Sequence, residues 1–306
     1  MDERIKDLER QREADPGNTD VLCELVALYE RTGRLYKGKT IQTWIEQLSG
    51  SWQEAWAAAE ALKEIGPLAC QAVEPLTLTL SHEYGSVRMA GAQALGQIGI
   101  VNKGVLSALL NCLQQYDSGI QMGAAEALGE LGVIGRELVI PALLRAMSES
   151  SIVPRRIIGG AIEKIGEQAP EMLEQLIEGL ADLDREHQDE LISALRALRV
   201  KGVRPGVFVG GLHHKNARVR SGVALVFQYC TEESAEEVWF WQAFEALKAG
   251  LSDPSEPARL ACLESLGTMR FKSKELIPVF ASIAGNKFKS VRNRARELLQ
   301  SFEEMN

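Results

Sequence analysis

Apolar and small residues recur along this chain at the spacing that places them on one face of an α-helix. In the stretch VRMAGAQALGQIG, residues 87–99, these positions are Val87, Ala90, Gly91, Ala94, Leu95 and Ile98. Gly91 and Gly96 lie inside this predicted helix, where a glycine costs about 1 kcal/mol relative to alanine. Because glycine lets a neighbouring helix come closer than a larger side chain would, we expect close helix–helix contacts here.

The same pattern returns at a nearly constant interval of about 33 residues. Eight copies end at Gly66, Gly99, Gly132, Gly166, Arg199, Thr231, Arg270 and Glu303, with steps of 33, 33, 34, 33, 32, 39 and 33 residues. A second amphipathic stretch precedes the copies, at 39–49, 73–81, 104–113, 139–147, 172–180, 241–251 and 276–284. Each repeat is therefore predicted to be a pair of helices, and we name the helix with the glycines the second helix.

The repeat predicts an all-α fold, an α-solenoid (superhelix) of about eight helix pairs. A single pair cannot bury its apolar stripe, so each pair buries it against its neighbours. We expect the solenoid over residues 39–306 and an N-terminal helical cap over residues 1–38. The glycine that ends several copies favours a left-handed helix cap. Within the cap, residues 15–34 (DPGNTDVLCELVALYERTGR) resemble a tetratricopeptide half-unit.

A VR pair, a small residue, ALG and IG, preceded by a leucine-rich helix and an Asp-Pro turn, resemble HEAT-like repeats. The chain is most similar to the short HEAT-like repeats of phycobilisome lyases. The best matches are VRMAGAQALGQIG, IQMGAAEALGELG and SDPSEPARLACLESLG. The resemblance implies second helices along the concave side and a surface that binds other macromolecules. It also leaves a bilin lyase of the E/F type open as an alternative, although no set of residues for a tetrapyrrole can be named.

Composition narrows the choice of partner. The net charge of −8 and the pI of about 5.3 disfavour binding to nucleic acid or to anionic membranes. No apolar run reaches the 18 or so residues of a membrane span, and the charged start MDERIKDLERQREAD lacks a signal-peptide core. The five cysteines include no CxxC pair, which favours reduced thiols. We therefore expect a cytoplasmic protein without metal or cofactor.

The repeat register places equivalent residues in rows. The position after the VR arginine holds Trp56, Met89, Met122 and Arg156 in the first copies. Trp56, Met89 and Met122 would form an apolar strip that receives an apolar anchor from a partner protein; alternatively, they fill gaps between adjacent helices. The VR arginine itself is expected to bind a neighbouring turn.

The C-terminal repeat is basic within an acidic chain. Between residues 270 and 296 there are eight basic residues and one acid, Glu275, a net charge of 8 − 1 = +7. This basic patch consists of Arg270, Lys272, Lys274, Lys287, Lys289, Arg292, Arg294 and Arg296. It predicts a docking surface for an acidic protein or phosphate, or else a charged cap that keeps the end of the solenoid soluble.

No catalytic or metal-binding arrangement stands out in the sequence. The function predicted is a non-catalytic protein–protein interaction scaffold whose partner is another protein. A bilin lyase is the alternative, and a nucleic-acid-binding HEAT-like protein is the less favoured third choice.

Overall fold

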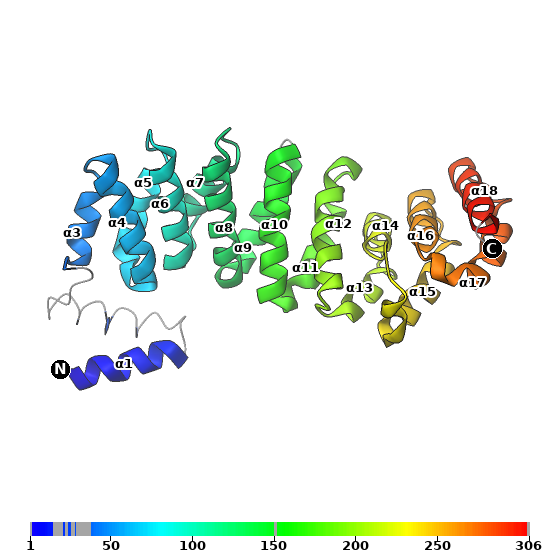
Figure 1. Cartoon of the computed structure of the whole chain (residues 1–306), viewed down its shortest axis with the longest axis horizontal. Coiled ribbons are helices and arrows are strands. Elements are labelled where there is room, and N and C mark those ends of the chain that lie inside the picture. The colour runs from blue at the N-terminus through cyan, green and yellow to red at the C-terminus, as the bar shows by residue number, and fades with distance from the viewer. Residues whose placement is uncertain are drawn as a thin grey trace. The chain divides into compact units, whose positions relative to one another are not determined.

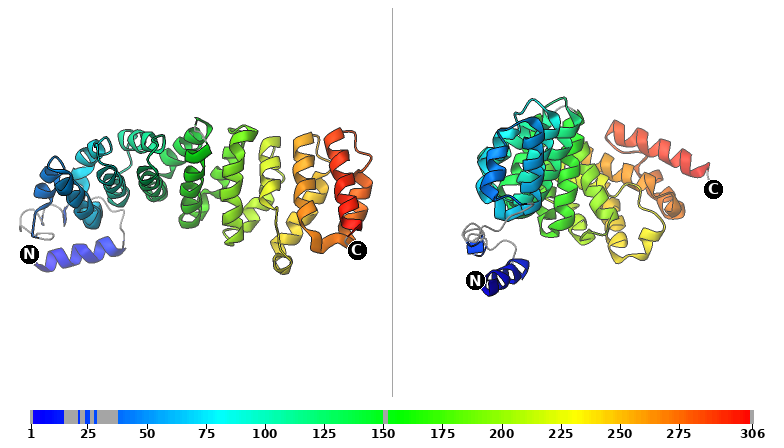
Figure 2. Two further views of the ribbon diagram at one scale, coloured as in Figure 1. Left: turned by 45° about the horizontal axis from the view of Figure 1, so that its top comes forward. Right: turned by 60° about the vertical axis from the view of Figure 1, so that its left-hand side comes forward.

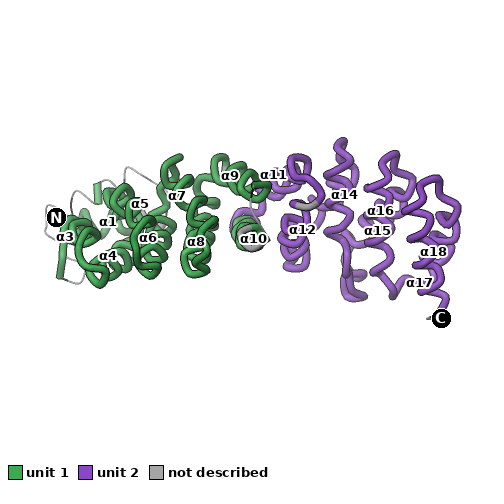
Figure 3. Tube along the Cα trace, turned by 90° about the horizontal axis from the view of Figure 1, so that it is seen from above, with its two compact units in different colours: residues 1–165 green, residues 166–306 purple. Residues whose placement is uncertain are grey.

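The computed structural model describes residues 2–14, 21, 24–25, 28, 38–149 and 152–304. The regular elements of these residues are helices (Figure 1). The chain divides into two units, residues 1–165 and residues 166–306 (Figure 3). None of the described helices combines the length and the apolar character that crossing a membrane requires.

Unit 1 begins with an N-terminal helix and continues as helix pairs. Its elements are α1 (Asp2–Ala14), α3 (Ile41–Gln47), α4 (Trp52–Ile65), η1 (Gly66–Ala72), α5 (Val73–Thr79), α6 (Gly85–Ile98), α7 (Lys103–Leu113), α8 (Ser118–Ile134) and α9 (Arg136–Glu149). Helix α10 (Ile152–Gln168) extends past the end of this unit. The second helices α4, α6 and α8 pack side by side, and each also contacts the first helix of its own pair (Figure 1).

Unit 2 repeats this arrangement. Its elements are η2 (Pro170–Met172), α11 (Leu173–Glu178), η3 (Gly179–Ala181), α12 (Arg185–Val200), α13 (Pro205–Gly211), α14 (Ala217–Val226), η4 (Glu233–Glu236), α15 (Val238–Gly250), α16 (Glu256–Thr268), η5 (Arg270–Lys272), α17 (Ser273–Ile283) and α18 (Lys289–Glu303). The second helices α12, α14, α16 and α18 lie next to one another (yellow-green to red in Figure 2). All eight predicted copies are helical, so the α-solenoid prediction is confirmed.

Close packing explains the glycines inside the helices. A Cβ atom on Gly96 would lie 2.7 Å from Cα of Ala127 on the neighbouring helix α8, and one on Gly91 would lie 2.0 Å from Oγ1 of Thr79. Neither position has room for a methyl group, since real Cβ atoms do not approach other atoms so closely. The expected helix–helix contacts are therefore confirmed at both residues.

Helix ends follow the sequence only in part. Ser51 and Glu54 form a capping box at the start of α4, and Gly99 ends α6 in the left-handed conformation with φ +79°. The same prediction is wrong for Gly132 and Gly166, where α8 and α10 continue to Ile134 and Gln168. A Cβ atom on either glycine would lie within 2.5 Å of an apolar side chain of the next repeat, Ile165 or Leu198, so packing rather than capping requires glycine there.

Helix α14 ends earlier than the periodicity predicts. The copy at 219–231 predicts a helix to its end, but α14 stops at Val226. Tyr229 then adopts φ +60°, a left-handed conformation that reverses the chain into the longest connection between repeats. This connection contains η4, and the indole N–H of Trp241 donates to the carbonyl oxygen of Ala235 at 3.0 Å. The aromatic residues of α15 thus cover the irregular joint, with Phe240 and Phe244 buried beneath.

Helix α1 packs on the first repeat. Ile5 and Leu8 share a buried cluster with Val21, Leu25 and Leu68, the last of which belongs to η1. The guanidinium of Arg4 also donates to both carboxylate oxygens of Glu24 at 2.9 Å. The tetratricopeptide-like stretch 15–34 falls mostly outside the described residues.

Candidate functional site

The row of VR arginines stabilises the turns between repeats. Arg88 donates to the carbonyl oxygens of His82 and Glu83 at 2.8 and 2.9 Å and to Oδ2 of Asp117 at 2.7 Å. Asp117 caps the start of α8 in the next repeat. One side chain therefore joins two successive turns, as the sequence predicts.

Glutamines take the same place in two repeats. The Gln121 amide donates to the carbonyl oxygens of Leu113 and Gln115 at 3.1 and 2.6 Å. The Gln188 amide donates to the carbonyl oxygen of Leu180 at 2.6 Å. Both glutamines are buried, so these two members of the row stabilise turns and offer no surface to a partner.

The apolar strip of Trp56, Met89 and Met122 lies on three adjacent second helices, α4, α6 and α8. Met122 is 69% exposed and Trp56 is 43% exposed. Met89 is half-buried, because it packs against Gly123 on the neighbouring helix α8. A Cβ atom on Gly123 would lie 3.0 Å from Cγ of Met89, so the glycine leaves room for the methionine. The strip thus offers two apolar side chains to a partner, with Met89 between them as support. Arg156, in the same row on α10, is exposed.

Two further aromatic residues lie near the strip and were not predicted. Trp52 and Tyr84 stack with ring centroids 5.6 Å apart, and they are 40% and 44% exposed. For Tyr84, the sequence contains one indication, which is an unusual residue at the start of a helix. Tyr84 occupies the N-cap of α6 without a side-chain capping bond, although Ser, Thr, Asp or Asn is preferred at that position.

The structure separates the predicted basic patch into two groups. Arg270, Lys272 and Lys274 lie on η5 and at the start of α17, whereas Lys287, Lys289 and Arg292 lie at the turn between α17 and α18. The 11 residues of α17 stand between the two groups, a length of about 16 Å. A ligand therefore contacts one of the two basic groups, or it is long enough to contact both.

Some members of the basic patch already have acidic partners. Arg294 binds Glu264 at 2.9 Å and Glu297 at 3.0 Å, and these carboxylates raise the pKa of its guanidinium against the opposing effect of burial. Lys272 lies 4.0 Å from the ring centroid of Trp241 and 3.4 Å from Glu275. Arg296 donates to the carbonyl oxygen of Ala284. Lys287 and Lys289 stay exposed at the α17–α18 turn.

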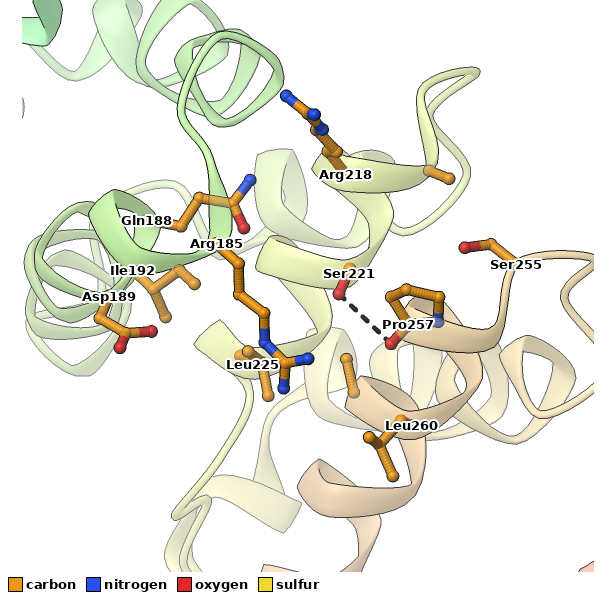
Figure 4. A pocket seen from close by; sticks show the side chains of 12 residues that line it. Arg185, Gln188, Asp189, Ile192, Arg218, Ser221, Leu225, Ser255, Pro257 and Leu260 are labelled. Atoms are coloured by element: carbon orange, nitrogen blue, oxygen red, sulfur yellow. Dashed lines mark hydrogen bonds between the residues drawn. The ribbon is translucent and has the colours of Figure 1, made fainter. Parts of the chain in front are cut away.

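A groove in unit 2 crosses the same row of second-helix residues. It has a volume of about 660 Å³ and lies along the starts of α12, α14 and α16. Figure 4 shows Ser221 donating to the carbonyl oxygen of Pro257 across it, at 3.3 Å. Arg185 on α12 and Arg218 on α14 line the groove, and their guanidiniums point to opposite ends of it (Figure 4). None of these residues was singled out from the sequence.

The buried thiols are not suited to nucleophilic chemistry. Burial raises the pKa of the Cys112 thiol to about 11, against a lowering by the charge of Arg88. Burial and the charge of Asp253 raise the pKa of Cys262 to about 12, against a lowering by Arg220. Because the thiolate is the reactive form, both cysteines act as apolar core residues at neutral pH.

The acidic and histidine side chains form local pairs. His214 Nε2 lies 3.0 Å from Oε1 of Glu178, and His187 Nδ1 lies 2.5 Å from Oδ1 of Asp184. Within the described ranges, no group of three or more His, Cys, Asp or Glu side chains is arranged to hold a metal ion.

The repeats in the first half of the chain match a known family of repeats. The family model of HEAT repeats matches residues 41–129 and 73–163. Comparison with curated protein sequences gives no match.

Solved structures with a similar fold are distant in sequence. The complex of CpcE and CpcF of phycocyanin lyase from Nostoc sp. PCC7120 is 19% identical, over 86% of this chain and 94% of that chain, with a TM-score of 0.36. A designed armadillo repeat protein is 15% identical over 86% and 99%, with a TM-score of 0.32. The karyopherin Kap121p, bound to the C-terminus of the phosphatase Cdc14p, is 15% identical over 86% and 33%, with a TM-score of 0.48. Each TM-score is below 0.5, so none of these structures assigns a function to this chain.

Proposed function

Because this chain is a HEAT-like repeat protein, we propose that it is a non-catalytic scaffold that binds another protein through its exposed helix faces. The observation that carries the proposal is the exposed apolar surface of unit 1. Trp56 and Met122 project from the second helices α4 and α8, on either side of α6, and the Trp52–Tyr84 pair extends the same surface. A monomeric protein gains nothing from leaving two tryptophans and a methionine in water, and such patches are typical of interaction sites.

The chemistry of the strip fits an apolar anchor from the partner. Tryptophan and tyrosine are enriched among the residues that dominate binding energy. Methionine is flexible and polarizable and adapts to irregular apolar surfaces. Covering Met122 alone would contribute about 1.5–3 kcal/mol if its exposed surface were fully buried. Trp56 would add a rigid ring at low cost in conformational entropy.

A second contact is proposed at the α17–α18 turn. Lys287 and Lys289 are exposed there, and Arg292 donates to the carbonyl oxygen of Asn286 at 2.8 Å, leaving its charge without a carboxylate. Such charges steer an acidic partner and raise the association rate. Lys272 and Arg294, which already have acidic or aromatic partners, serve the terminal repeat itself.

Two further parts of the proposal concern the termini and the compartment. Residues 1–38 are proposed to cap the solenoid of residues 39–306, since Ile5 and Leu8 share a buried cluster with Leu68 in η1, directly after the first copy. A cytoplasmic location is proposed because the thiols of Cys112, Cys230 and Cys262 are free.

The test is site-specific photo-crosslinking. A photoreactive phenylalanine analogue replaces Met122 in the full chain, and in a matched chain it replaces Leu78, which is 78% exposed on the first helix α5. The scaffold proposal expects a protein that crosslinks from position 122 and not from position 78. Capture of that protein should fail with Met122→Glu and survive with Leu78→Glu.

Two results would contradict the proposal. One is capture of the partner that survives both Met122→Glu and Leu78→Glu, which would show that the apolar strip does not bind the partner. The other is a shifted, protein-bound absorbance when the pure chain is mixed with a free bilin, which would favour the lyase alternative.

A further inference from the structure

We propose that the groove along α12, α14 and α16 binds an acidic, extended segment of a protein partner, with one carboxylate bound by Arg185, a second bound by Arg218 at the opposite end, and an aliphatic side chain on the floor. This inference rests on the proposed scaffold function and adds a second site and the chemistry of its ligand. The apolar strip of unit 1 contributes no residue to it.

The shape and the floor of the groove suit a few side chains of a peptide. Its volume of about 660 Å³ is in the range of ligand-binding clefts. Leu225 and Leu260 are half-buried on its floor, and Pro257 is exposed beside them. These apolar groups come from α14 and α16, while α12 supplies the opposite wall (Figure 4). An aliphatic side chain inserted here would complete their burial.

Charge decides which segment fits. Arg185 makes no hydrogen bond or ion pair with any described residue, and the guanidinium of Arg218 donates, among the described residues, only to the carbonyl oxygen of Ala181 at 3.4 Å. Arg220 in the same unit is bound differently, because its guanidinium forms an ion pair with Asp253. Each guanidinium lacks a carboxylate partner among the described residues, in a chain of net charge −8, and offers forked donors that match one carboxylate. Asp189, the carboxylate on the groove wall, forms no ion pair with either of them.

The positive edge continues beyond the groove. Ser290 at the start of α18 hydrogen-bonds the carboxylate of Glu256, which precedes Pro257 at the start of α16. The exposed Lys287 and Lys289 therefore follow the groove in the next turn. An extended segment that lies across α12, α14 and α16 would reach these lysines with its following acidic residues.

A peptide fits this surface better than a nucleic acid does. Single strands are held by aromatic side chains on which bases stack, and the groove lining contains no aromatic residue. Asp189 would also repel a phosphate backbone, whereas a peptide can place a neutral residue beside it. The ligand chemistry that matches the groove is thus alternating acidic and aliphatic side chains.

The test measures binding of defined probes to the full chain. A short fluorescein-labelled peptide that alternates Glu and Leu is titrated with the protein, and fluorescence anisotropy gives the dissociation constant. We expect saturable binding that weakens with salt, and at least about tenfold weaker binding for the double variant Arg185→Glu with Arg218→Glu. Leu260→Gln should weaken the same probe several-fold without a change in charge.

A matched variant controls for net charge. Arg204→Glu with Lys274→Glu makes the same charge change at exposed residues of unit 2, at the starts of the first helices α13 and α17. Binding equal to that of the unchanged chain is expected for this control. Circular dichroism and thermal unfolding confirm that every variant is folded.

Three results would overturn the inference. They are no saturable binding of the Glu-Leu peptide, equal losses in the groove variant and its matched control, and tighter binding of a labelled oligothymidylate than of the peptide. Failure of the scaffold proposal would be recognised separately, because Met122→Glu changes crosslinked partner capture and leaves binding of the peptide probe unchanged.

Discussion

Arg220 on α14 holds Asp253, in the turn before α16, through two charge-assisted hydrogen bonds. Its Nε lies 2.6 Å from Oδ2 and its Nη2 lies 2.9 Å from Oδ1. The remaining nitrogen, Nη1, donates to the carbonyl oxygens of His214 and Lys215 at 2.8 and 3.0 Å. One guanidinium therefore closes its own turn and fixes the next one. In unit 1, Arg88 and Asp117 link two successive turns in the same way.

Removing Asp253 should destabilise the protein strongly. The side chains of Arg220 and Asp253 are only 16% and 10% exposed, so Asp253→Ala leaves a mostly buried charge without its partner. We expect a loss of about 3 kcal/mol in the free energy of unfolding, measured by urea denaturation. Glu264→Ala is the control, because its partner Arg294 is 37% exposed; its loss should stay below about 1 kcal/mol. Equal losses would contradict the structural role of the buried pair.

The same pair predicts a component of acid sensitivity. Burial alone would raise the pKa of the Asp253 carboxyl, but the hydrogen bonds from Arg220 and Ser255 and the nearby positive charges hold it below its usual value. Its contribution to stability is therefore complete above the unfolded-state pKa of about 3.9 and is lost as the pH falls through the lower folded-state value.

Asp253→Asn tests this component. The variant should be less stable than the unchanged chain at neutral pH, and the difference should shrink as the pH falls below about 4. Urea midpoints followed by circular dichroism across this range measure it. A difference that stays constant at every pH would show that the carboxylate charge is not what stabilises the turn.

Two glycine substitutions should act in opposite directions. Gly96→Ala places a methyl group 2.7 Å from the backbone of Ala127 and should cost about 1–3 kcal/mol through overpacking. Gly160→Ala, in the interior of α10, meets no atom within 4 Å and should stabilise by about 0.5–1 kcal/mol through helix propensity. Thermal unfolding of both variants gives the comparison. Stabilisation by Gly96→Ala would show that the helices are not packed so closely.

The buried cysteines should resist alkylation. Cys112 and Cys262, with their raised pKa values of about 11 and 12, carry about 0.1% thiolate or less at pH 8. Iodoacetamide should modify them in urea but not in the native protein, as peptide mass spectrometry would show. A cysteine introduced at the exposed Ser193 serves as the reactive control. Equal modification rates for Cys112 and the control would contradict the burial.

The helices could be predicted because their signal is local. The copy at 187–199 corresponds to α12 at Arg185–Val200, and the copy at 291–303 to α18 at Lys289–Glu303. Helix ends depend on more distant residues. Gly132 looks like a cap in the sequence, but Ile165 fills the space beside it and α8 continues.

The candidate sites depend even more on packing. The row position identified Trp56 and Met122, but only the neighbouring Gly123 explains why Met89 is half-buried. Arg185 and Arg218 could not be selected, because nothing in the sequence distinguishes them from arginines that have partners. Whether an arginine is occupied depends on which turn lies next to it in space.

The glutamines of the arginine row give the repeats different mechanical properties. Gln121 and Gln188 hold their turns through hydrogen bonds from their uncharged side-chain amides to backbone carbonyl oxygens. Dissolved ions barely weaken such bonds. The link at Arg88–Asp117 is ionic, and dissolved ions screen it because the Asp117 side chain is 39% exposed. The more deeply buried pair of Arg220 and Asp253 is screened much less. Ionic strength would then soften some joints and leave others stiff, so that the elasticity of this chain varies from one repeat to the next and responds to its surroundings.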